Sequence, residues 1–245
     1  MPNLKQYNVV MKNTIIYVIA ILFSITQYSQ SKEECFANLS IFAEYAKVKN
    51  YKAAYQPWVD LKNQCPDLNS AIYVLGERML KSFIKTSDDS LKTQYQKDLV
   101  VLYDEWLQYF PKTKRGVSEV GKILAIKAQA LSDYKLADDT EILKIYDEAF
   151  SRDPKSFKSP KGLYNYFKLY FKLYKAGDPS VTLEKVFDKY EELTEKFEYE
   201  MGVYTSKLDV LLKKEENSDP LTSREIRNKK AVSYTHLTLP TILLV

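Results

Sequence analysis

The sequence between residues 51 and 66 reads YKAAYQPWVDLKNQCP. On a helix, Ala54, Trp58 and Leu61 share one face, because they follow one another at intervals of four and three residues. Pro66 then ends the run, since proline cannot continue a helix. The same apolar spacing and closing proline return twice, as Leu99, Tyr103, Trp106 and Pro111, and as Ile142, Tyr146, Ala149 and Pro154. This recurrence predicts a chain that repeats one helical unit.

Two segments place a glycine inside an apolar helical pattern. They read Ile72-x-x-Leu75-Gly76-x-x-Met79 and Val117-x-x-Val120-Gly121-x-x-Leu124. In a helix interior, glycine is about 1 kcal/mol less favourable than alanine. Each of these glycines therefore needs a structural reason.

These patterns resemble the tetratricopeptide repeat, a pair of antiparallel helices. The matching residues of the first unit are Ile41, Tyr45, Tyr51, Ala54, Trp58, Leu61 and Pro66. In that family the glycine permits close approach of the partner helix. The resemblance implies an all-α fold, a right-handed superhelix of stacked antiparallel helix pairs that presents a concave surface to partner segments. The packing positions are Ala54, Trp58, Leu61, Pro66, Leu75, Gly76, Tyr103, Trp106, Val120, Gly121, Tyr146 and Ala149.

The spacing of the units departs from that family. The closing prolines lie 45 and then 43 residues apart, whereas a strict tetratricopeptide repeat has about 34, so HEAT-like helix pairs are the alternative. The extra length falls in loops at residues 86–90 and 132–140, which are rich in residues that cap helix N-termini. We expect helix caps there rather than calcium loops, because the ligand pattern of an EF-hand is missing.

The most aromatic stretch, residues 162–177, reads GLYNYFKLYFKLYKAG and follows a helix start at Ser159-Pro160. One interpretation is a helix buried between neighbours with one wet edge. The other is a concave aromatic groove with lysines at its rim, able to hold an extended peptide or a sugar. Its candidate partner-binding residues are Tyr166, Lys168, Tyr170, Lys172 and Tyr174.

The last part of the chain predicts three further helices. Residues 183–197 are amphipathic, and a second helix is expected over residues 199–214. Residues 222–225, TSRE, form a capping box that starts the third helix.

The N-terminus predicts an export signal over residues 1–31, with Met11 as an alternative start. This segment has no acidic residue, a positive Lys12, an apolar core at residues 15–25 and a small-x-small cleavage site at residues 29–31. An uncleaved anchor is the alternative, although the apolar run is shorter than the roughly 20 residues of a spanning helix. We therefore expect an exported protein that is periplasmic, outer-membrane-associated or secreted.

The two cysteines predict a disulfide. On the repeat template, Cys35 starts the first helix and Cys65 ends the second, so both lie at the same end of an antiparallel hairpin. Export would allow oxidation. A bond between them would stabilise the fold by roughly 3–4 kcal/mol on the chain-entropy estimate, and two free buried thiols are the alternative.

The C-terminal residues 231–245 read AVSYTHLTLPTILLV and have no charge and no helical period. Residues 232–241 resemble the conceptual translation of a transposon-end sequencing adapter. We therefore expect residues 231–245 to be an artefactual or disordered tail on an incomplete helical-repeat domain at residues 32–230. A genuine apolar tail or strand is the alternative. The tail holds His236, the only histidine.

Composition and motifs point away from catalysis. The formal net charge of +4 falls to +2 without Lys5 and Lys12, which is too near neutral to indicate nucleic acid. The sequence has no GxSxG, GxGxxG, P-loop, HExxH or CxxC motif, so we expect no enzyme activity, no cofactor and no metal. The leading hypothesis is a scaffold for a protein or peptide partner in the bacterial envelope. The alternatives are a structural envelope component anchored through a missing C-terminal region and a carboxylate-dependent hydrolase.

Overall fold

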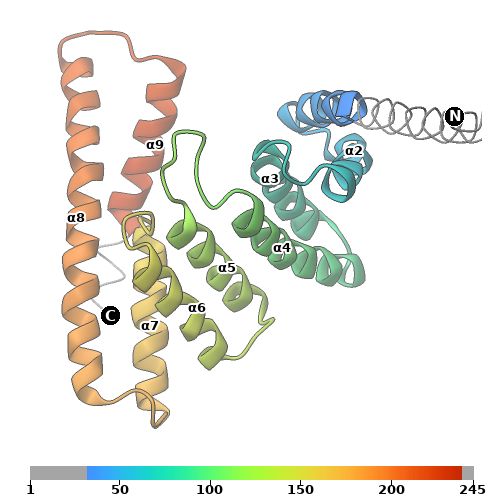
Figure 1. Cartoon of the computed structure of the whole chain (residues 1–245). Helices are drawn as coiled ribbons and strands as arrows, with labels where there is room; N and C mark the ends of the chain where they lie inside the picture. The colour runs from blue at the N-terminus through green and yellow to red at the C-terminus, as the bar shows by residue number, and fades with distance from the viewer. Residues whose placement is uncertain (1–31, 239–245) are drawn as a thin grey trace, which may run out of the picture. The chain divides into compact units, whose positions relative to one another are not determined.

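The computed structural model describes residues 32–238, and side-chain environments as far as residue 230. This part of the chain is helical, with a single isolated β-bridge between Lys112 and Ser118, so the all-α prediction is confirmed (Figure 1). Residues 32–47 are helical and precede α2 (Tyr51–Gln64), α3 (Ala71–Thr86), α4 (Asp89–Tyr109), α5 (Val120–Tyr134), α6 (Asp139–Arg152), α7 (Pro160–Lys175), α8 (Leu183–Glu216) and α9 (Ser223–Thr238). None of the described helices is long and apolar enough to cross a membrane. The predicted signal segment lies outside the described residues.

The chain divides into two compact units, with the boundary between Glu105 and Trp106. In the N-terminal unit, Cys35 and Cys65 lie at disulfide distance, with their Cα atoms 6.3 Å apart, and tie the first helical segment to the end of α2. The predicted pair is thus brought together. The side of the first helix that faces the core, however, is not the one that the resemblance implied. Ile41 and Tyr45 are exposed, and Phe42 is buried in their place.

The interface between α2 and α3 depends on one tryptophan. Ala54, Trp58 and Leu61 are buried, as predicted, and the Trp58 indole N–H donates to the Ile72 carbonyl at 3.0 Å. A Cβ atom on Gly76 would lie 2.5 Å from Trp58 Nε1. The glycine of α3 is therefore required by the close approach of the α2 indole.

Polar contacts join α4 to α2 and α3. The Tyr103 hydroxyl donates to Glu77 Oε1 of α3 at 2.9 Å, and Lys62 of α2 pairs with Glu105 at 2.8 Å. The Tyr73 hydroxyl donates to the Pro66 carbonyl at 2.9 Å, which ties the α2–α3 turn to α3. These bonds give the polar groups at the edge of the N-terminal core a partner within the protein.

In the C-terminal unit, α5 and α6 form a close antiparallel pair. A Cβ atom on Gly121 would lie 2.9 Å from the Ala149 carbonyl oxygen and closer still to that of Asp153. Gly121 thus packs against the following helix, whereas Gly76 packs against the preceding one. The two glycine segments resemble each other in sequence but differ in their packing partner.

Most of the residues expected at packing positions are buried. Tyr103, Trp106, Tyr146 and Ala149 are at most 2% exposed. Pro66, Leu75 and Val120 are the departures, because they are only partly buried.

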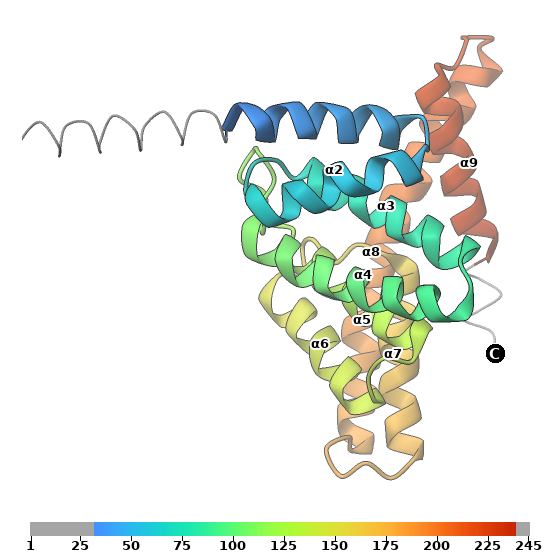
Figure 2. The same cartoon turned by 90° about the vertical axis from the view of Figure 1, so that its right-hand side faces the viewer.

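Helices α8 and α9 end the C-terminal unit and pack against each other. The single helix α8 covers the two helices expected there, since residues 197–199 contain no glycine or proline to break it. Both views show α9 lying beside the second half of α8, and Lys214 of α8 pairs with Glu225 of α9 at 2.6 Å (Figures 1 and 2). The capping box is confirmed, because the Thr222 backbone N–H donates to Glu225 Oε2 at 2.9 Å and the Glu225 N–H donates to Thr222 Oγ1 at 3.2 Å. Helix α9 reaches Thr238, past the domain end expected at residue 230.

Candidate functional site

The aromatic helix α7 is held by a cap and by a core of rings. The Ser159 hydroxyl accepts a hydrogen bond from the Gly162 N–H at 3.1 Å, and Pro160 fills the first helical position, as predicted. Tyr166 is fully buried and stacks on Tyr146 of α6, with ring centroids 5.3 Å apart. These contacts fix which side of α7 faces the core.

The burial of Tyr166 and Tyr170 corrects two of the expected partner-binding residues. Tyr166 donates its hydroxyl proton to Asp147 of α6, and Tyr170 is 7% exposed. Burial, followed by the hydrogen bond to Asp147, raises the pKa of Tyr166 above its usual value, so this hydroxyl stays protonated. Tyr166 can be a core residue because its hydroxyl finds the Asp147 carboxylate as an acceptor inside the protein.

The other three predicted residues have different surroundings. Lys172 is exposed and pairs with Asp139 of α6 at 2.5 Å. Tyr174 is half-buried against Phe171, with ring centroids 6.3 Å apart. Lys168 alone of the five lines the groove described below.

A groove of about 580 Å³ runs between α7 and α8, on the side of α7 away from Tyr166. Its floor is apolar, because Leu163 and Leu193 are 1% and 4% exposed. Its lining is Leu163, Tyr164, Phe167, Lys168 and Phe171 of α7, with Tyr190, Leu193, Thr194, Phe197 and Glu198 of α8. We call these ten residues the aromatic groove.

The aromatic groove leaves large rings open to solvent. Phe171 is 43% exposed and Tyr190 is 50% exposed. The rings of Phe167 and Tyr190 meet edge to face across the helices at 5.5 Å, while Phe167 stacks on Phe171 at 6.3 Å. Exposed rings that gather in one concavity are typical of a binding surface, whereas isolated exposed rings are ordinary.

The sequence contained part of this signal. Tyr164, Phe167 and Phe171 recur at intervals of three and four, which places them on one side of α7. The buried tyrosines of the same helix recur with the same period, so spacing alone does not say which side is core. The contribution of α8 had no marker in the sequence.

The described residues hold no group of three or more histidine, cysteine or acidic side chains that could bind a metal ion. Comparison with protein-family models, with curated proteins and with solved structures finds no match to this chain.

Proposed function

We propose that this chain is an exported, non-catalytic helical scaffold that binds a segment of a protein partner in the bacterial envelope. The observation that carries the proposal is the aromatic groove, in which Phe171 and Tyr190 remain exposed above a buried leucine floor. Aromatic side chains in such a site lose much solvent contact on binding and supply large contact area at low entropic cost.

The occupant we propose is an amphipathic helix. Tyr190 and Glu198 lie about 12 Å apart along α8 at 1.5 Å per residue, which matches about two turns of a bound helix. Two turns present three apolar side chains on one face, enough to cover the rings of both walls. Within the described residues no strand edge exists to pair with an extended peptide, whose amides would then lack partners in the groove.

Two charged groove residues favour one orientation of the bound helix. Lys168 of α7 and Glu198 of α8 are exposed groove residues of opposite sign. A partner helix with an acidic residue near Lys168 and a basic residue near Glu198 would complement both. The reverse order would place like charges together, so the pair favours one orientation of the bound helix.

The cell-envelope location rests on two sequence features and one contact. The predicted signal segment directs export, and Cys35 and Cys65 lie at disulfide distance in a chain with only these two cysteines. An oxidising compartment would preserve that bond. We further propose that the helix pairs α5–α6 and α7–α8 stack in the manner of tetratricopeptide-like or HEAT-like units, which is supported by the close approach at Gly121.

Selection of peptides tests the groove directly. A display library of linear peptides is selected on the purified chain, and enriched peptides are then measured against variants. We expect apolar residues at helical spacing, and a loss of at least about 30-fold in affinity for the F171S/Y190S variant. The matched control is Val210→Ser, because Val210 is an exposed apolar residue of α8 outside the groove. Enriched peptides that bind the double variant as tightly as the control would overturn the proposal.

A further inference from the structure

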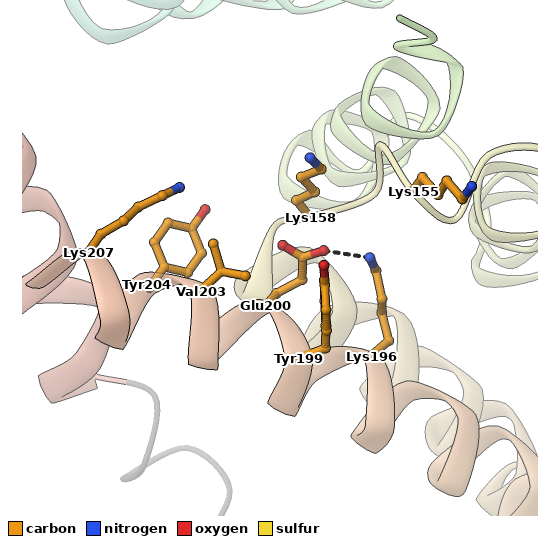
Figure 3. A pocket seen from close by; sticks show the side chains of 8 residues that line it. All are labelled: Lys155, Lys158, Lys196, Tyr199, Glu200, Val203, Tyr204 and Lys207. Carbon is orange, nitrogen blue, oxygen red and sulfur yellow. Dashed lines mark hydrogen bonds and ion pairs between the residues drawn. The ribbon is translucent and has the colours of Figure 1, made fainter.

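A second concave site lies on another side of α8 from the aromatic groove. It encloses about 500 Å³ between the α6–α7 connection and the middle of α8. Its lining is Lys155, Lys158, Lys196, Tyr199, Glu200, Val203, Tyr204 and Lys207. Figure 3 shows Lys155 and Lys158 of the connection on one side of this space and the α8 side chains on the other, with the Glu200 carboxylate paired with Lys196. We call it the lysine pocket.

The lysine pocket carries an excess of positive charge. Four of its residues are lysines, and Glu200 is its single acid. Lys196 pairs with Glu200 at 2.5 Å. Among the residues that the structure describes, no ion pair involves Lys155, Lys158 or Lys207, which are all exposed. Three exposed lysines thus line one cavity, and none of them has an acidic partner in the part of the chain that the structure describes.

Glu200 is the buried polar residue in the lining of the lysine pocket. It is 4% exposed, and a buried carboxylate is unfavourable unless it is paired. Its pairing holds the Lys196 ammonium 5.5 Å from the centre of the exposed Tyr199 ring, which restricts the lysine to one side of the pocket. Glu200 therefore orients a fourth cation while it neutralises only one.

Tyrosine hydroxyls add neutral donors. Tyr204 is half-buried in the pocket wall, and burial together with the nearby Glu200 charge raises its pKa. It therefore remains a hydrogen-bond donor at neutral pH. The Lys207 ammonium lies 5.7 Å from the centre of the Tyr204 ring.

We infer that the lysine pocket binds a phosphate-type oxyanion, with Lys155, Lys158 and Lys207 as its direct ligands. Lysine is a compact point charge that suits phosphate, which offers acceptor oxygens in several directions. The Glu200–Lys196 pair is the positioning element. A cavity of about 500 Å³ is many times the share of one water molecule, about 30 Å³, so the phosphate belongs to a larger group such as a diphosphate or a phospholipid head group. This inference does not depend on the aromatic groove.

Calorimetric titration of the full chain with inorganic pyrophosphate tests the site. We expect one binding event that weakens as sodium chloride is raised, because counter-charges screen the lysines. The K155Q/K158Q/K207Q variant should lose at least about tenfold in affinity. The control is K47Q/K52Q/K85Q, which removes the same charge from exposed lysines of the N-terminal unit and should stay within about twofold.

A second arm separates the two sources of phosphate. Vesicles of phosphatidylglycerol are sedimented with the same proteins, and vesicles of phosphatidylcholine serve as the neutral reference. Binding to the anionic vesicles that needs the three lysines assigns the site to a lipid head group, and lysine-dependent pyrophosphate binding without it assigns a soluble ligand. The inference is overturned if wild type binds neither probe, or if the pocket variant binds as well as the charge-matched control. Lys207→Gln alone, with a loss of about threefold, decides the point should the triple variant fail to fold.

Discussion

Replacing Gly76 by alanine separates close packing from helix propensity, because the two effects have opposite signs. In an ordinary helix this change stabilises by up to about 1 kcal/mol. At Gly76 the new Cβ atom would lie 2.5 Å from Trp58 Nε1, far inside van der Waals contact. The indole must then move, although its N–H donates to the Ile72 carbonyl at 3.0 Å and its ring is buried.

The magnitude follows from three contributions. Overpacking in a core costs about 1–3 kcal/mol. A buried indole N–H that loses its acceptor costs about 1–3 kcal/mol more, and the gain in helix propensity offsets about 1 kcal/mol. We expect Gly76→Ala to lower the free energy of unfolding by about 1–5 kcal/mol.

Gly202→Ala is the matched control. Gly202 lies within α8, and a Cβ atom there would meet nothing within 4 Å. We expect this change to stabilise the protein by about 0.5–1 kcal/mol. Urea unfolding followed by tryptophan fluorescence measures both variants, and hydrogen exchange of α2 and α3 peptides assigns the loss to the N-terminal unit. If Gly76→Ala raises stability as Gly202→Ala does, the packing argument for α2 and α3 is wrong.

Three further predictions concern other contacts of the fold. Gly121→Ala should destabilise by about 3 kcal/mol, because its Cβ would meet two backbone carbonyls that cannot turn aside; urea unfolding measures this, and a neutral effect would contradict it. Replacing Cys35 and Cys65 by serine should cost roughly 3–4 kcal/mol, and thiol counting on native exported protein should find none free, whereas two free thiols would refute the pairing. Hydrogen bonds from Lys214 and Thr222 hold the pKa of Glu225 at about 2, so its stabilising contribution should be complete above pH 4.5 and lost as the pH falls through 2. An NMR titration reads this pKa directly; Lys214→Met should raise it toward 4.5, and an unchanged value would exclude the lysine as its main cause.

The parts of the fold that could be predicted are those in which local pattern and packing agree. Ala54, Trp58 and Leu61 are buried because only one face of α2 is apolar enough to enter the core. The first helical segment offered two neighbouring apolar stripes, and the sequence could not show that the side with Phe42 faces inward. The cysteine pair was predictable because both ends of one hairpin are close in space.

The aromatic groove shows why a site is harder to predict than a helix. Helix α7 is aromatic on two sides, and tertiary contacts with the ring of Tyr146 and the carboxylate of Asp147 help to make Tyr166 a core residue. The lysine pocket combines Lys155 and Lys158 of the α6–α7 connection with residues 196–207 of α8, and no sequence motif links segments so far apart. Both sites depend on tertiary contacts that spacing along the chain does not encode.

Photo-crosslinking in living cells is the most direct test of the scaffold proposal. A benzophenone amino acid is placed at Phe171 in the aromatic groove and, as the control, at Val210 on the same helix but outside the groove. Mass spectrometry then maps the crosslinked segment of the partner. The scaffold proposal predicts a crosslink at Phe171, absent at Val210, to an amphipathic helical segment of one envelope protein. Equal crosslinking at the two positions, crosslinks to lipid alone, or no crosslink at Phe171 would contradict it.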